Sequence, residues 1–155
     1  PVHPPPGRFS VVGEGDARTV APANPARYSP LVSVLASLDA RRVAAAYTAL
    51  YPRLQKTYEE LGYPGKYFND RVIHVIDQLL VTPEPAYAVT IKLLELKGDM
   101  PSAQPWLRYE FADSGLQALS SGQKMLLRVG GAHRATLKAK LRELRAQIAR
   151  ASVTR

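Results

Sequence analysis

The chain contains no cysteine among its 155 residues. This absence excludes disulfide bonds and thiolate chemistry, but it leaves the compartment open because many exported proteins also lack cysteine. No apolar run approaches the roughly 18 residues that would span a bilayer. The chain begins at Pro1 and carries no signal peptide. We therefore expect a processed or excised part of a longer protein, with any targeting segment upstream.

Motifs of nucleophilic catalysis and nucleotide binding are also missing. The chain has only three histidines and no Gly-x-Ser-x-Gly sequence. Gly13-Glu14-Gly15 lacks the third glycine and the following helix of a nucleotide-binding loop, so it indicates a plain turn. These absences argue against an enzyme, and they indicate no cofactor.

Positive charge is concentrated at the end of the chain. The net charge is +8, of which residues 131–155 carry +6 and the preceding 130 residues carry +2. This distribution argues against a globally basic nucleic-acid-binding protein and predicts one local basic helix.

The strongest pattern in the sequence is a helical hairpin over residues 39–80. In its first arm apolar residues recur at steps of four, three, four, four and three: Val43, Tyr47, Leu50, Leu54, Tyr58 and Leu61. In its second arm a similar set follows: Val72, Ile73, Ile76, Leu79 and Leu80. Such spacing puts one apolar stripe on each helix, and we expect the two stripes to face a common core. Pro52 predicts a kink near Thr48 rather than an end of the helix.

Local signals define the ends of these two helices. Asp39 is the predicted N-cap of the first arm, and Gly62 is expected to end it in a left-handed conformation. Tyr63-Pro64-Gly65-Lys66 has the sequence of a type II turn. Asn69 is then the predicted N-cap of the second arm.

The other segments predict one α+β domain over residues 8–150, mainly helical, between a Pro-rich tether at 1–7 and a disordered basic tail at 151–155. A short β-hairpin is predicted from 8–12 and 18–20. Residues 87–93 alternate as a strand that pairs with 106–111 across the loop 98–105, and a helix over 89–97 is the alternative. Further helices are predicted at 29–38, 113–119, 121–129 (with a capping box at Ser120 to Gln123) and 132–150.

One candidate binding site is the turn between the two arms, at the start of a helix, where backbone N–H groups favour anions. Its polar and aromatic residues are Tyr63, Lys66, Tyr67, Asn69, Asp70 and Arg71. A carboxylate, a phosphate or a sugar fits such a turn. The structural alternative is that the same residues make the turn, cap the helix and staple the two arms, and it explains nearly all of them.

A weaker candidate is a metal site made of Asp70, His74 and Asp77, which lie four and three residues apart on one helix face. The usual Glu-x-x-His and His-Glu-x-x-His motifs are absent. A solvated polar face of an amphipathic helix produces the same pattern, so the sequence predicts no metal here.

The last helix combines an apolar stripe with a basic flank. The stripe consists of Leu137, Leu141, Leu144 and Ile148, and the flank consists of Arg134, Lys138, Arg142 and Arg145. Three interpretations remain open: docking on the domain's own core, pairing with a partner helix, and contact of the flank with an anionic polymer or membrane surface. Docking on the chain's own core is the default, and partner-helix binding is the best functional alternative.

Several ordered blocks resemble one bacterial family. They are Tyr63–Arg71, Tyr109–Asp113 and Ser121–Arg128, with Pro6–Phe9 and Leu50–Pro52 in support. Together they resemble the family called domain of unknown function 3014 over almost the whole chain. The resemblance implies a Gram-negative envelope protein with an N-terminal membrane anchor, a Pro/Ala-rich spacer and this domain outside the cytoplasmic membrane. It brings no established activity and no catalytic residue, and 98–104 is longer than its pattern.

Three functions follow as hypotheses. The leading one is a non-enzymatic, protein-binding scaffold module of the cell envelope, expected on the periplasmic side. The alternative is a small binding domain for an anionic ligand at the 63–71 turn or the basic flank. The third is a metal-assisted hydrolase. Sequence-specific nucleic acid is not an expected partner, and membrane contact is expected only through an upstream anchor.

Overall fold

The computed structural model describes residues 7–94 and 109–153. Its elements in chain order are β1 (Val11–Val12), η1 (Gly15–Ala17), β2 (Thr19–Val20), η2 (Asn24–Tyr28), α1 (Ser29–Ser37), α2 (Ala40–Glu60), α3 (Phe68–Leu80), β3 (Ile91–Leu93), β4 (Tyr109–Phe111), α4 (Ser114–Ala118), α5 (Ser121–Arg128) and α6 (Gly131–Val153). The chain is mainly helical with two small antiparallel sheets, which confirms the predicted fold class. No helix within the described residues is both long and apolar enough to cross a membrane.

Contacts within the chain define two compact units, each built from two separate stretches. The first unit contains Pro1–Pro30 and Pro83–His133, and the second contains Leu31–Thr82 and Arg134–Arg155. The single domain predicted over residues 8–150 stays a prediction. The predicted tether falls almost entirely on residues 1–6, outside the described part of the chain.

The first unit contains both β-hairpins. β1 pairs with β2, which confirms the first predicted hairpin. β3 pairs with β4 with Lys92 opposite Glu110, and their side chains form an ion pair of 3.2 Å. A bridge between Thr19 and Thr90 joins the two hairpins. Residues 91–93 are therefore a strand rather than a helix, and this strand is shorter than the predicted 87–93. The predicted loop 98–105 and the first part of the predicted partner strand, 106–108, lie outside the described residues.

Two capped helices close the core of this unit. That core is formed by Ile91, Phe111 and Leu127. The carboxylate of Asp113 accepts a hydrogen bond from the backbone N–H of Leu116 at the start of α4. Ser120 and Gln123 form the predicted capping box at the start of α5. Both helix starts thus confirm the sequence prediction.

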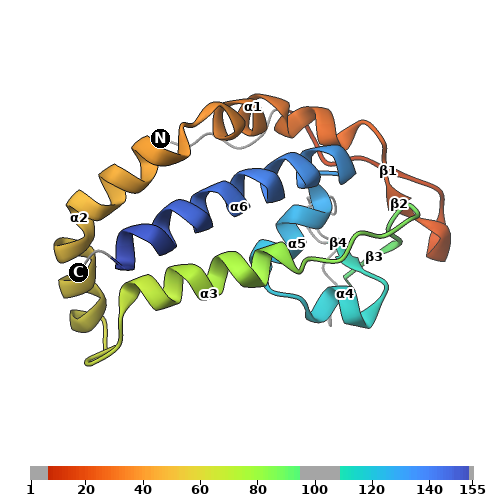
Figure 1. Cartoon of the computed structure of the whole chain (residues 1–155). Helices are drawn as coiled ribbons and strands as arrows, with labels where there is room; N and C mark the ends of the chain where they lie inside the picture. The colour runs from red at the N-terminus through yellow and green to blue at the C-terminus, as the bar shows by residue number, and fades with distance from the viewer. Residues whose placement is uncertain (1–6, 95–108, 154–155) are drawn as a thin grey trace. The chain divides into compact units, whose positions relative to one another are not determined.

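The second unit is formed mainly by α2, α3 and α6, with α6 running between α3 and the α1–α2 segment (Figure 1). The core of this unit contains one buried residue from each of three helices: Ala44 of α2, Ile76 of α3 and Ile148 of α6. Leu141 of α6 packs on the same cluster. The apolar stripe of α6 therefore docks on its own unit, the default interpretation of the sequence.

The buried face of α2 differs from the predicted one. Leu50 and Leu61 belong to the predicted stripe, yet they are 50% and 71% exposed. The buried residues are Ala44 and Tyr51, each one position after a member of that stripe. Because residues one apart lie about 100° apart around a helix, α2 is turned relative to the prediction. The small Ala44 side chain permits the close approach of the neighbouring helices. The predicted stripe faces the core only in part, since Tyr47 packs against it while Leu50 and Leu61 remain exposed.

The ends of α2 and α6 refine two further predictions. The Asp39 carboxylate accepts hydrogen bonds from the backbone N–H groups of Arg41 and Arg42, at 2.8 and 3.1 Å. α2 continues without interruption across Pro52, as predicted. α6 ends at Val153, so it includes the first three residues of the predicted disordered tail. Residues 154–155 lie outside the described part.

We predict that Gly130→Ala destabilises the first unit more than Gly15→Ala does. Both glycines have positive φ, 89° and 53°. Each substitution adds the cost of a left-handed side chain, about 1–2 kcal/mol. A Cβ on Gly130 would also lie 2.6 Å from Pro25 Cγ, whereas a Cβ on Gly15 would meet nothing within 4 Å. Denaturant unfolding measures both losses, and equal losses would show that the Pro25 contact has no effect.

Candidate functional site

The turn between α2 and α3 has the predicted geometry. The backbone N–H of Lys66 donates to the Tyr63 carbonyl at 3.2 Å, and Gly65 has a φ of 70°. The Tyr63 ring stacks on that of Tyr58 with centroids 4.5 Å apart, and the Lys66 ammonium lies 6.0 Å from the Tyr63 ring centre. The turn is therefore held by aromatic stacking onto α2.

The start of α3 is capped from α2 and not by Asn69. The N-cap residue is Tyr67, whose side chain makes no capping bond. Instead, the Gln55 amide oxygen accepts from the Phe68 backbone N–H at 2.8 Å, while its nitrogen donates to the Lys66 carbonyl at 2.9 Å. Asn69 lies inside the first turn, where its side-chain oxygen accepts from the Tyr47 hydroxyl. The prediction of an Asn69 cap was wrong because a side chain from a neighbouring helix takes that position.

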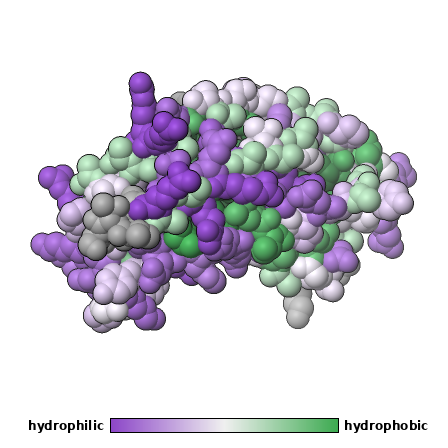
Figure 2. Space-filling model, in the orientation of Figure 1, coloured by the Kyte–Doolittle hydropathy of each residue, from purple (hydrophilic) through white to green (hydrophobic). Residues whose placement is uncertain are grey.

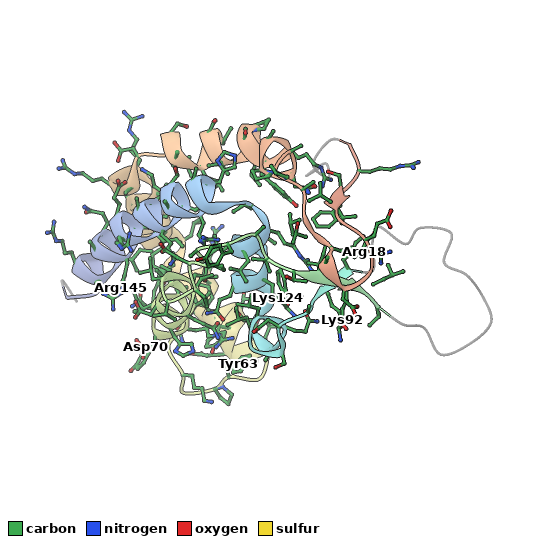
Figure 3. The ribbon with its side chains drawn as sticks, turned by 90° about the vertical axis from the view of Figure 1, so that its right-hand side faces the viewer. Arg18, Tyr63, Asp70, Lys92, Lys124 and Arg145 are labelled. Atoms are coloured by element: carbon green, nitrogen blue, oxygen red, sulfur yellow. The ribbon has the colours of Figure 1, made fainter. Side chains whose placement is uncertain are left out.

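This arrangement removes part of the anion site predicted at the turn. The Gln55 side chain already accepts the hydrogen bond of the first free N–H of α3, which is one of the groups that an anion would use. Tyr67, Asp70 and Arg71 are exposed, and their side chains make no hydrogen bond or ion pair within the described residues. Tyr63 and Asp70 are labelled in Figure 3. The six candidate residues thus form a capped and stapled turn rather than a closed pocket.

The metal candidate has no supporting geometry. Asp77 holds Arg145 of α6 in a two-pronged ion pair, with Nε–Oδ1 at 2.5 Å and Nη2–Oδ2 at 2.9 Å. Across residues 7–94 and 109–153, no group of three His, Cys, Asp or Glu side chains is placed to hold a metal ion. Asp77 therefore joins α3 to α6 and is not available as a ligand beside Asp70 and His74.

The basic flank of α6 is divided between buried and exposed positions. Hydrophilic side chains line α6 on the face turned to the viewer in Figure 2. However, Arg134 and Lys138 are only 7% and 4% exposed to solvent, while Arg142 is exposed. Arg145 is engaged with Asp77. The four residues therefore do not form one exposed cationic surface.

Two lysines of α6 donate hydrogen bonds to backbone carbonyls at the C-terminal ends of other helices. The Lys138 ammonium donates to the Thr82 carbonyl at 2.7 Å, just after α3. The Lys140 ammonium donates to the Leu38 carbonyl at 2.9 Å, just after α1, and also contacts Glu143. Cations stabilise helix C-termini because the last carbonyls lack partners and carry the negative end of the dipole. Lys140 was not among the predicted residues, since only tertiary packing brings it to Leu38.

A serine–histidine contact occurs in the first unit and was not visible in the sequence. His133 Nε2 lies 3.0 Å from Ser29 Oγ and 3.1 Å from the Pro25 carbonyl oxygen. The carbonyl can only accept, so Nε2 must carry the hydrogen and donate it. A protonated Nε2 cannot take the proton of Ser29, so the pair holds α1 to the start of α6 and is not set up as nucleophile and base.

An open apolar surface lies on α2. A hollow of about 230 Å³ is lined by Leu50, Arg53, Leu54, Thr57, Tyr58, Leu61 and Phe68. The five residues from Leu50 to Tyr58 recur along one face of α2, Leu61 is the C-cap residue of that helix, and Phe68 begins α3. We name Leu50, Leu54, Thr57 and Leu61 the α2 seam. The sequence contained a signal for it, since α2 carries more apolar positions than one buried face needs, but the rotation of the helix was not predictable.

Comparison with known proteins identifies a family and no closer relative. The family model described as "Protein of unknown function (DUF3014)" matches residues 1–145. The match covers most of the chain and confirms the resemblance found in the sequence. No curated protein and no solved structure gives a significant match.

We predict that Gln55→Ala lowers the free energy of unfolding by about 1–2 kcal/mol, because it removes the cap of α3 and the bond to the turn. Thr57→Ala is the matched control, two residues along the same helix and exposed. Denaturant unfolding of both variants measures the difference. Similar stability of the two would contradict the cap.

The carboxyl group of Asp77 should titrate abnormally because of Arg145. The hydrogen bond from Arg145 lowers the pKa of Asp77 below its usual 3.8. The folded state thus gains stability above pH 3.8 and loses it as the pH falls through the lowered pKa. In Arg145→Gln, an NMR titration should show the pKa of Asp77 returning toward 3.8.

Asp39 is the internal control in the same titration. Its pKa is lowered by hydrogen bonds from the backbone N–H groups of Arg42 and Arg41, which Arg145→Gln leaves in place. The pKa of Asp39 should therefore not change. An unchanged Asp77 pKa in the variant would show that the ion pair does not persist in solution.

Proposed function

For a chain that belongs to the DUF3014 family of proteins of unknown function, we propose a role as a non-enzymatic protein-interaction module that docks a helical partner on the α2 seam. The observation that carries this proposal is the exposed apolar face of α2. Leu50 and Leu61 remain half or more exposed although the same helix buries Ala44 and Tyr51 in its own unit.

The hollow beside the seam supports docking by a protein side chain. It is lined by leucine, tyrosine, phenylalanine and threonine side chains and by the exposed Arg53. A volume of about 230 Å³ is enough for one large apolar side chain, judging from cavities that hold a benzene ring. Apolar anchors in such hollows carry most of the energy of helix-in-groove complexes.

The spacing of the seam favours a helix over an extended peptide. Leu50, Leu54, Thr57 and Leu61 follow one another at steps of four, three and four. A second helix packs against such a row by inserting its own apolar side chains between them. The partner-helix hypothesis therefore moves from α6, whose stripe is used internally, to α2.

The polar groups that the other two functions would use have structural roles. Lys138, Lys140 and Arg145 bind carbonyl or carboxylate groups of the same unit. His133 is oriented by a carbonyl. These contacts favour a binding module over the anion-binding and hydrolase alternatives.

Location in the bacterial cell envelope is part of the same proposal. Its support is the family likeness described above, which implies an anchored protein with this domain outside the cytoplasmic membrane. A docking module held on a tether gains effective concentration for a partner at the same membrane.

Photo-crosslinking in cells tests the docking face. A photoreactive phenylalanine analogue at Thr57 of the full-length protein should give a discrete adduct, identified by mass spectrometry. The same analogue at the exposed Ala45, on the far side of α2, is the control and should give none. Adducts of equal yield from both positions, or no adduct from Thr57, would reject the seam as a docking face.

A further inference from the structure

Charged residues accompany the α2 seam on one side only. Arg53 precedes Leu54 and Glu60 precedes Leu61, so both lie on the same flank of the helix. Arg53 is exposed and makes no hydrogen bond or ion pair within the described residues. Glu60 contacts Lys56 at 3.9 Å, with both side chains more than half exposed. Such a surface pair contributes little, so Arg53 and Glu60 are both available to a partner.

Two opposite charges seven residues apart on one flank of a helix can pair with the same two charges of a second copy. This pairing occurs when the two helices pack antiparallel. If two α2 helices pack antiparallel, Leu54 faces Thr57 of the second copy and Leu50 faces Leu61. The flank of one helix then meets the same flank of the other, which places Arg53 beside Glu60 of the second copy twice, as a two-fold axis requires. In a parallel pair Arg53 would face Tyr58 instead, and the charges would find no partner.

We propose that the helical partner of the α2 seam is the α2 of a second copy of this chain, packed antiparallel about a two-fold axis. This inference rests on the proposed docking function and names its partner. A leucine of the second copy enters the hollow beside Tyr58 and Phe68, and the two Arg53–Glu60 pairs fix the direction of packing. Pro52 does not interfere, because it lies on the side of α2 away from the seam.

The size of the seam sets the expected strength of the dimer. The segment Leu50–Leu61 spans about 17 Å at 1.5 Å per residue. A contact of this length is small beside stable interfaces, which bury about 800 Å² on each partner. The dimer should therefore be reversible and depend on protein concentration.

Charge reversal with the complete chain tests the proposal. Sedimentation equilibrium should show dimerisation of the wild type. Arg53→Glu and Glu60→Arg each place like charges together twice, and each should weaken dimerisation at least about tenfold. The double variant, Arg53→Glu with Glu60→Arg, restores both pairs and should dimerise as the wild type does.

Mixing the two single variants gives a result that a merely unfolded variant cannot give. One variant carries only acidic residues on the flank and the other only basic ones, so an equimolar mixture should form a heterodimer that neither forms alone. Thermal melting followed by circular dichroism verifies that each variant is folded.

A wild-type chain that remains monomeric at every concentration, or single variants that dimerise unchanged, would overturn the proposal. The broader docking function has a separate outcome. If the chain is monomeric but Thr57 still crosslinks to a different protein, self-association is rejected and docking stands. If the chain is monomeric and Thr57 gives no adduct, both are rejected.

Discussion

The contact between Ala44, Ile76 and Ile148 determines the rotation of α2, and most of the second unit follows from that rotation. A methyl side chain at this point lets α3 and α6 approach α2 closely, whereas larger side chains would hold the helices apart. With Ala44 turned inward, Gln55 points to the start of α3 and caps it. The same rotation leaves Leu50 and Leu61 outside. One packing choice therefore sets both the stability of the hairpin and the surface proposed for docking.

The basic character of α6 acquires a structural explanation from the same unit. Lys138 and Lys140 donate to carbonyls after α3 and α1, and Arg145 binds Asp77. A helix that lies between other helices meets their unsatisfied carbonyl ends, and long cationic side chains can reach them while their aliphatic stems remain buried. Much of the positive charge at the end of the chain therefore holds helices together. An anion-binding role is not needed to explain it.

Local signals in the sequence were reliable wherever a single segment determines the structure. The Asp39 cap, the turn at Tyr63–Lys66, the capping box at Ser120 and the strand at residues 91–93 were all predicted. The failures have one physical cause, which is the choice among partners distant in sequence. Asn69 is a good capping residue, but Gln55 is better placed. The apolar residues of α2 outnumber the positions that one face can bury, and periodicity alone does not say which of them face inward. For this reason the sequence signalled an excess of apolar residues on α2 but did not show which of them form the exposed seam.

The segments of the two units alternate along the sequence, and this order has a consequence for biosynthesis. Each unit is assembled from an early stretch and a late one, and the second is completed only by residues 134–155. During synthesis, α2 and α3 leave the ribosome long before α6, so the faces around Ala44 and Ile76 stay uncovered until Ile148 arrives. Nascent chains with exposed apolar faces are prone to aggregation and to capture by chaperones. A C-terminal truncation or a ribosome stall before α6 would therefore leave the hairpin formed but its core open, and we expect such fragments to be cleared quickly by the cell.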